Sequence, residues 1–119
     1  KSVAWHVSET LEQGGAKIIY TVRSQKRRTE LLALKPDAEI VVCDFEKAHD
    51  IDSLGSYLKS KGNNSIHGVL HSIAFANYSE GLKPFHETNV KDYLQATQIS
   101  SFSLVELANA CKPALQKDD

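Results

Sequence analysis

The sequence feature that most constrains the fold is the stretch at residues 66–77, where an apolar run passes into small residues. Ile66-His67-Gly68-Val69-Leu70 is short, rich in branched apolar residues and entered through Gly62-Asn63-Asn64-Ser65, a pattern typical of a buried strand. The run closes as His71-Ser72-Ile73-Ala74-Phe75-Ala76-Asn77. In an open parallel sheet such an exit lies at the carboxyl edge, where ligands bind. Its small side chains would let a planar ligand approach the backbone, and Phe75 would form one wall of a pocket. The alternative is a loop that packs on its own sheet.

Three apolar runs, each followed by a helical pattern, predict an α/β fold. The runs lie at residues 16–22, 39–43 and 66–71, and their β-branched and aromatic side chains are typical of buried parallel strands. Strands that alternate with helices favour a parallel sheet with helices on both faces. We therefore expect a Rossmann-like, doubly wound parallel sheet. The strands at 16–22 and 39–43 should be neighbours, and the strand at 66–71 should lie apart from them.

Helical patterns flank these runs. Ser2 stands where an N-cap would, Gly14-Gly15 stands where the first helix must end, and its apolar face would consist of Val3, Val7 and Leu11. A later helix ends near Gly62, and its core stripe would consist of Ile51, Leu54, Tyr57 and Leu58.

The last third of the chain predicts one long helical stretch, capped by Thr88 and reaching about Leu115. Ile99-Ser100-Ser101 would mark a bend or a small-residue contact, and Pro113 requires that the last turns be distorted or ended. The apolar face expected on this stretch consists of Val90, Leu94, Ile99, Phe102, Val105, Leu107 and Ala108.

Five blocks of the sequence resemble, in the same order, those of one enzyme family. The heptapeptide His71-Ser72-Ile73-Ala74-Phe75-Ala76-Asn77 is similar to a signature of bacterial enoyl-acyl-carrier-protein reductases, a divergent branch of the short-chain dehydrogenase/reductase superfamily. Ile99-Ser100-Ser101-Phe102-Ser103-Leu104 resembles the family's Ile-Ser-Ser-Tyr-Ser helix, with Phe102 in place of tyrosine. The other blocks, which extend the resemblance over essentially all 119 residues, are Lys1-Ser2-Val3-Ala4-Trp5, Gly15-Ala16-Lys17-Ile18-Ile19-Tyr20-Thr21 and Cys43-Asp44-Phe45.

The resemblance implies an NAD(P)H-dependent enzyme that reduces the enoyl double bond of acyl-carrier-protein thioesters in fatty-acid biosynthesis. A hydride would pass from nicotinamide to the enoyl β-carbon, and the complete protein would be a homotetramer. We interpret His71 as a strand-end histidine satisfied by backbone rather than as a proton donor. The resemblance places on the cofactor side Ser2, Val3, Arg23, Asp44, Phe45 and Ile73, and at the border of the acyl or inhibitor pocket Phe75 and Ala76.

The resemblance also implies that residues 1–119 are an internal part of a single dinucleotide-binding domain. The family's first strand and glycine turn would precede Lys1, and its catalytic pair, spaced Tyr-x-x-x-x-x-x-Lys, would follow the chain. We therefore expect an incomplete sheet, no catalytic residue in this segment, and no turnover by the segment alone. The tyrosines that fail this spacing are Tyr20, Tyr57, Tyr78 and Tyr93.

A cluster of cations, Arg23-Ser24-Gln25-Lys26-Arg27-Arg28, follows the run at 16–22 and contains no acid. In a dinucleotide-binding sheet the end of the second strand faces the adenosine ribose, where an acid bonds the 2′-hydroxyl of NAD and an arginine binds a 2′-phosphate. The alternative is a solvated basic helix start. We assign the functional interpretation to Arg23 alone, and expect Arg27 and Arg28 on the exposed face of a helix that runs to Leu34. NADPH is therefore favoured over NADH.

Asp44 directly follows the run at 39–43. A carboxylate at this edge can accept hydrogen bonds from the adenine amino group, and the family resemblance gives Asp44 and Phe45 that role. The alternative is an acid at a helix N-terminus, a role that Glu46 and Asp50 also suit. We favour the adenine contact because Asp44 precedes the helix by several residues.

Tyr57 and Lys61 have the Tyr-x-x-x-Lys spacing of the catalytic pair in ordinary short-chain dehydrogenases. That pair lies on a helix after the fourth and fifth strands of the superfamily, whereas Tyr57 precedes the fourth. We therefore reject Tyr57 as catalytic and expect it in the core.

Composition excludes several other classes of protein. The net charge of −1 gives no electrostatic case for nucleic acid or an anionic membrane, and no apolar run approaches the roughly 20 residues of a membrane helix. Cys43 and Cys111 match no metal-ligand spacing, and free thiols suggest a reducing cytoplasm. We expect a cytoplasmic protein with no metal, nucleic-acid or membrane partner. The alternative functions are another short-chain reductase that acts on a carbonyl, and a non-catalytic nucleotide-binding module.

Overall fold

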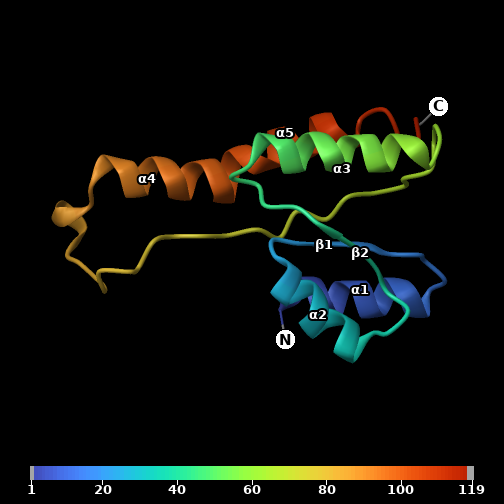
Figure 1. Cartoon of the computed structure of the whole chain (residues 1–119), viewed down its shortest axis with the longest axis horizontal. Coiled ribbons are helices and arrows are strands. Elements are labelled where there is room, and N and C mark those ends of the chain that lie inside the picture. Colours follow the sequence, from blue (N-terminus) through green and yellow to red (C-terminus); the bar gives the residue numbers. More distant parts are fainter. Residues whose placement is uncertain (1, 118–119) are drawn as a thin grey trace.

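The computed structural model describes residues 2–117 and has an α/β architecture around a two-stranded parallel sheet. In Figure 1 helices α1 and α2 lie on one side of the sheet, and α3 and α5 lie on the other. The elements are α1 (Val3–Gln13), β1 (Ile19–Val22), α2 (Gln25–Leu34), β2 (Glu39–Val42), α3 (Ala48–Ser60), the 3-10 turn η1 (Phe85–Glu87), α4 (Val90–Thr97), the π-helical turn η2 (Gln98–Phe102) and α5 (Ser103–Cys111).

The two strands pair as the sequence predicts. β1 and β2 are parallel neighbours, in a register that runs from Ile19 opposite Glu39 to Val22 opposite Val42. One further bond, from Cys43 N to Val22 O at 2.8 Å, extends the pairing past the end of β2. Both strands are shorter than predicted, and their carboxyl ends meet at one edge of the sheet.

The predicted buried strand at residues 66–71 is wrong for this structure. Among the described residues its one bridge joins Ile66 to Leu115, with bonds from Ile66 N to Ala114 O (2.9 Å) and from Gln116 N to Ile66 O (2.7 Å). Val69 and Leu70 are 45% and 53% exposed. A strand needs a hydrogen-bonded neighbour, and none of the described segments lies beside residues 67–71 to supply one. The segment is also unpaired with β1, as predicted.

Helix α1 has the predicted ends but not the predicted burial. The Ser2 hydroxyl accepts a hydrogen bond from Trp5 N at 3.2 Å, and the chain leaves the helix through Gly15, whose φ of +93° favours glycine. Val3 and Leu11, expected on a buried face, are exposed. The pattern identifies which residues share a face, but burial requires a second surface to cover that face.

The hydrophobic core lies between α3, α5 and the end of β2. The predicted stripe of α3 is confirmed, because Ile51, Leu54 and Leu58 are buried and Tyr57 packs against them. The remaining buried members of this core are Cys43, Phe45, Leu107, Cys111 and Ala114. Since Phe45 and Cys43 directly follow β2, the core also fixes the segment at the sheet edge.

Two glutamates are each held by a tyrosine and a lysine. Glu39 accepts a hydrogen bond from the Tyr57 hydroxyl at 2.6 Å and one from Lys61 Nζ at 2.8 Å. The bond from Lys61, followed by that from Tyr57, lowers the pKa of Glu39, and the bond to Glu39 raises the pKa of Tyr57. Tyr57 and Lys61 therefore fasten α3 to the amino end of β2, away from the sheet's carboxyl edge. A similar cluster joins α1, β1 and the end of α2 and consists of Glu12, Tyr20 and Lys35.

The predicted long helical stretch is α4, η2 and α5 in succession. Its cap is Asn89, whose side chain accepts from Asp92 N at 2.8 Å, and not Thr88, whose hydroxyl instead donates to Phe85 O. The predicted bend at Ile99-Ser100-Ser101 coincides with η2. The last α-helical residue is Cys111, two positions before Pro113.

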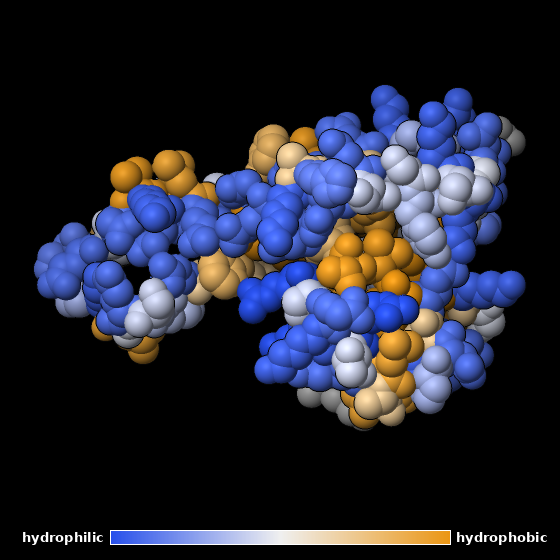
Figure 2. Space-filling view, viewed as in Figure 1, coloured by the Kyte–Doolittle hydropathy of each residue, from blue (hydrophilic) through white to orange (hydrophobic). Residues whose placement is uncertain are grey.

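The apolar face expected on this stretch is only partly buried. Ile99 and Leu107 are buried, whereas Val90, Leu94, Phe102 and Val105 are exposed, and Figure 2 shows apolar side chains on the outer surface of α4. The helix α4 and the loop before it project from the rest of the molecule (Figure 1). The radius of gyration, 16.0 Å, accordingly exceeds the roughly 13.5 Å typical of this chain length. Within the described part of the chain, every helix is too short or too polar to span a bilayer.

Candidate functional site

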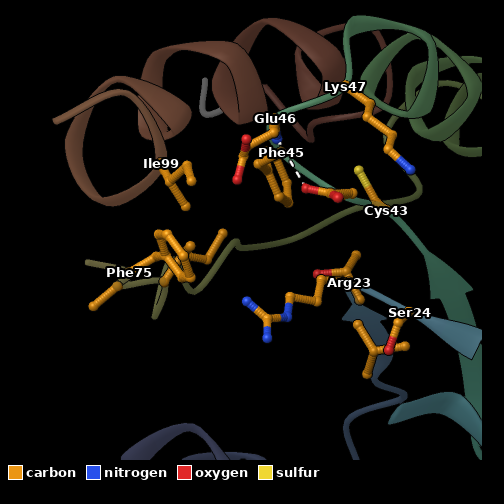
Figure 3. Close-up of a pocket in the computed structure, with 13 residues that line it drawn as sticks. Arg23, Ser24, Cys43, Phe45, Glu46, Lys47, Phe75 and Ile99 are labelled. Atoms are coloured by element: carbon orange, nitrogen blue, oxygen red, sulfur yellow. Dashed lines mark hydrogen bonds between the residues drawn. The ribbon is translucent and has the colours of Figure 1, made fainter. Parts of the chain in front are cut away.

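A cavity of about 350 Å³ lies at the carboxyl edge of the sheet. The ends of β1 and β2 form one side, and the segment at residues 73–75 and η2 form the other (Figure 3). Its lining residues are Thr21, Val22, Arg23, Ser24, Cys43, Asp44, Phe45, Glu46, Lys47, Ile73, Ala74, Phe75 and Ile99. Five residues predicted to be functional, which come from three separate segments, thus line one cavity: Arg23, Asp44, Phe45, Ile73 and Phe75.

Arg23 is the first residue after β1 and extends its side chain into the cavity. Its guanidinium carbon lies 5.6 Å from the centre of the Phe75 ring (Figure 3), within the range of a cation–π contact. Arg27 is exposed as predicted and pairs with Glu30 at 3.0 Å, but Arg28 is half-buried and not on the exposed face as predicted. Arg23 is therefore the arginine that the fold directs to this edge.

Asp44 lies in the turn between β2 and α3. Its Oδ1 accepts a hydrogen bond from Glu46 N at 3.0 Å, and its backbone N–H donates to Asp50 Oδ2 at 2.9 Å. Both carboxylates thus accept a hydrogen bond within the turn, and Asp44, three residues before the cap of α3, also lines the cavity. Phe45 is buried beneath the turn and fixes its position.

The segment at residues 71–75 is held by two serine side chains. Ser100 accepts from Phe75 N at 2.9 Å and donates to Phe75 O at 3.1 Å. Ser103 lies 2.8 Å from His71 Nε2 and donates its own proton to Ile99 O at 2.6 Å. His71 Nε2 must therefore donate to Ser103. The prediction that His71 bonds to backbone groups is wrong for Nε2, because its hydrogen-bond partner is the buried hydroxyl of Ser103 on α5.

Cys43 lines the cavity, but its thiol is unreactive. Burial, followed by the nearby carboxylates of Asp50, Asp44 and Glu106, raises the pKa of its thiol to about 12. Burial also raises the pKa of the second free thiol, Cys111. Both remain protonated near neutral pH and are poor nucleophiles. Residues 2–117 contain no cluster of three or more possible metal ligands of the histidine, cysteine, aspartate and glutamate types.

A second, more open groove adjoins the first cavity on the other side of Phe75. Its lining includes the small residues Ala74, Ala76 and Ala96 and the aromatic residues Tyr78 and Tyr93. Phe75 thus borders both spaces, and Ala76 borders the groove alone. The two consecutive residues predicted at an acyl or inhibitor pocket, Phe75 and Ala76, therefore both line this groove.

Ser2 and Val3 do not join the other predicted cofactor residues. Both are exposed at the start of α1, where the Ser2 hydroxyl caps the helix, and neither is among the described residues that line the cavity. The sequence predicted a bend or a small-residue contact at residues 99–101 but not that Phe75 is the partner of Ser100, and it missed the contact of Ser103 with His71. The signal was present, because small hydroxyl residues inside an apolar helical stretch suit a close contact with backbone.

Comparison with known proteins identifies the family of the chain. The sequence profile described as "Enoyl-(Acyl carrier protein) reductase" matches residues 1–118. The chain belongs to this family. The enoyl reductase resemblance of the sequence is thereby confirmed.

Two curated relatives differ in the cofactor that their names carry. The NADPH enoyl-[acyl-carrier-protein] reductase FabI of Staphylococcus aureus is 36% identical over 118 residues, covering 94% of this chain and 45% of that protein. The NADH enzyme of Bacillus subtilis is 30% identical over 120 residues, covering 97% of this chain and 46% of its own length. The chain therefore spans about half the length of the curated enoyl reductases that it matches.

A solved enoyl reductase structure shares the fold. The Bacillus cereus enzyme, crystallised with NADP⁺ and an indole naphthyridinone, superposes with a TM-score of 0.82 at 31% identity, over 96% of this chain and 46% of that one. The α/β arrangement thus matches an enoyl reductase fold over about half of its length.

Proposed function

We propose that this chain forms the adenosine side of the cofactor site in an NAD(P)H-dependent enoyl-acyl-carrier-protein reductase. The observation that carries the proposal is the cavity at the carboxyl ends of β1 and β2, which gathers Arg23, Asp44 and Phe45 with Ile73. Parallel α/β sheets bind nucleotides at this edge. The family membership supports the same reaction, the NAD(P)H-dependent reduction of an enoyl thioester, for the complete protein.

The residues of the cavity fit the adenosine half of a dinucleotide. The volume of about 350 Å³ lies in the range of small-molecule sites. Asp44 offers a hydrogen-bond acceptor for the adenine amino group, Ile73 and Phe45 form apolar surface for the ring, and Arg23 offers a cation. The bound cofactor would supply a hydride, and these residues would orient it.

The groove between residues 74–78 and α4 is the proposed acyl site. Phe75 and Ala76 border it, and its aromatic and alanine lining suits an apolar chain. The substrate would be an enoyl thioester of acyl-carrier protein. Because Phe75 separates this groove from the cavity, the cofactor and the enoyl group would meet beside the 73–76 backbone.

We further propose that the complete protein has the doubly wound parallel sheet of the Rossmann type. A strand between β1 and residues 66–71 would pair with the backbone groups of 67–71 that lack partners among the described residues, and would cover Val69 and Leu70. A glycine turn after that strand would bring Ser2 and Val3 to the cofactor side. The exposed apolar residues of α4 and α5 suit contacts within a homotetramer, and the free thiols suit the cytoplasm.

Arg23 favours NADPH as the cofactor of this protein. A guanidinium binds a 2′-phosphate through paired, charge-assisted hydrogen bonds. The acids that line the cavity, Asp44 and Glu46, follow β2, whereas residues 23–28, which follow β1, contain no acid. One good contact shifts the preference roughly tenfold.

The test is kcat/KM for NADPH and NADH in the full-length protein with crotonyl thioester, at fixed salt. We expect an NADPH preference that falls about tenfold in Arg23→Ala and is unchanged in Arg27→Ala, the matched exposed arginine on α2. Equal ratios in wild type and Arg23→Ala would refute the role of Arg23. Reduction of a ketoacyl but not of an enoyl thioester would refute the proposed reaction and favour a carbonyl reductase.

A further inference from the structure

Residues 78–88, here called the flap, form a loop that is held together by its own bonds. Gly81 N donates to Tyr78 O at 2.9 Å, Lys83 pairs with Glu80, and the Thr88 hydroxyl donates to Phe85 O at 2.8 Å. The flap connects the 71–77 segment to α4 at the far left of Figure 1. Its tip side chains are open to solvent, with Leu82 88% and Phe85 94% exposed. The flap is therefore an internally bonded unit whose placement depends on its two stems.

Both stems of the flap are bound by one carboxylate. Asp92 Oδ1 accepts a hydrogen bond from Asn77 Nδ2 at 3.1 Å, and Asp92 Oδ2 accepts one from Asn89 Nδ2 at 2.8 Å. Asn77 precedes the flap and Asn89 follows it. The two amides also serve the backbone, because Asn77 Oδ1 accepts from Ser79 N at 3.0 Å and Asn89 Oδ1 accepts from Asp92 N at 2.8 Å. Asp92 thus ties the entry of the flap to its exit.

A carboxylate is the side chain that this clamp requires. An ionised aspartate only accepts hydrogen bonds and has two oxygens, so it serves two amide donors at once. An asparagine at position 92 would direct its own NH₂ group at one of the two amides. The bond that caps α4 runs from the backbone N–H of residue 92 to Asn89 Oδ1, so the Asp92 carboxylate takes no part in it.

The clamp lies beside the proposed acyl groove. Tyr78, the first residue of the flap, and Tyr93, the neighbour of Asp92, both line that groove with Ala76, the neighbour of Asn77. We infer that Asp92 is a positioning residue, which holds the Tyr78 end of the flap at the groove and so sets the affinity of the enzyme for long acyl chains. This inference rests on the proposed function. Short enoyl thioesters, which end before the flap, would not depend on the clamp.

The test compares two clamp variants of the full-length protein with a matched control. Asp92→Ala removes both bonds, and Asn89→Ser removes one amide but keeps an oxygen that caps α4. Asp52→Ala, an exposed aspartate near the start of α3, is the control. We expect Asp92→Ala to raise KM for dodecenoyl thioester about three- to tenfold, because fewer molecules hold the flap in place. KM for crotonyl thioester and for the cofactor, and kcat, should stay within about twofold of wild type.

Amide hydrogen exchange supplies a second readout that does not depend on activity. Backbone amides of residues 78–88 should exchange faster in Asp92→Ala and Asn89→Ser and not in Asp52→Ala. Unchanged exchange, or equal rises in KM for the short and the long substrate, would overturn the inference. If the wild-type protein reduces no enoyl thioester, the proposed function fails. The role of Asp92 is then tested by the binding of dodecenoyl-CoA, measured by calorimetry. Weaker binding by Asp92→Ala than by the wild-type protein supports the inference, and equal binding overturns it.

Discussion

Replacing Ser100 with alanine should release the segment that separates the cavity from the groove. The Ser100 hydroxyl accepts from Phe75 N at 2.9 Å and donates to Phe75 O at 3.1 Å, in a partly buried setting. Removing the hydroxyl leaves both backbone groups without these bonds, which costs about 1–3 kcal/mol. At 1.4 kcal/mol per factor of ten, the Phe75 amide should lose roughly five- to a hundredfold of its protection against hydrogen exchange.

The assay is hydrogen exchange at the Phe75 amide, with two matched variants. Ser101→Ala changes the exposed serine next to Ser100 in the same π-helical turn and should leave the amide protected. Ser100→Thr keeps a hydroxyl and should restore most of the protection. Equal exchange in wild type and Ser100→Ala, or equal losses in Ser100→Ala and Ser101→Ala, would show that η2 does not hold this segment through Ser100.

Two further changes test the framework around the site. Glu39→Gln should lower the free energy of unfolding in urea at pH 7 by about 0.5–1 kcal/mol, a small value because the carboxylate is half-exposed and screened. The folded-state pKa of Glu39 is lowered below 4.5, so the stabilisation by its carboxylate is complete above that pH and is lost as the pH falls through the folded-state pKa. The loss of unfolding free energy in Glu39→Gln should therefore be smaller at pH 3 than at pH 7, and equal losses would contradict the assignment. Gly55→Ala should raise the free energy of unfolding by about 0.5–1 kcal/mol, because a Cβ on α3 would stand 3.6 Å from Ala110 Cα and O, an ordinary contact. Gly62→Ala is the control and should lower the free energy of unfolding, because Gly62 has a φ of +99°. A loss of stability in Gly55→Ala would show that α3 and α5 pack too closely for the added methyl group.

Local chemistry made several elements predictable. The cap of α1 at Ser2, the glycines that end it, and the apolar stripe of α3 depend on residues within a few positions of one another. The edge position of Arg23 and Asp44 was predictable for a related reason. Each directly follows a strand, and the carboxyl ends of neighbouring parallel strands must lie at the same edge of the sheet.

Burial and long-range contacts were not predictable in this way. The apolar runs at 66–71 and on α1 and α4 have the pattern of buried elements, yet Val69, Leu11 and Leu94 are exposed because no described segment covers them. A periodic pattern specifies which side chains share a face, whereas burial depends on what packs against that face.

The sequence by itself determined the family, the α/β alternation and the edge at which the functional residues gather. The tertiary structure alone decided that Ser100 holds Phe75, that Ser103 bonds His71, and that Asp92 ties the two stems of the flap. These contacts join side chains to groups up to 32 positions away in the chain. No local pattern encodes them, because a hydroxyl or carboxylate acquires its partner only when packing brings the two segments within hydrogen-bonding distance.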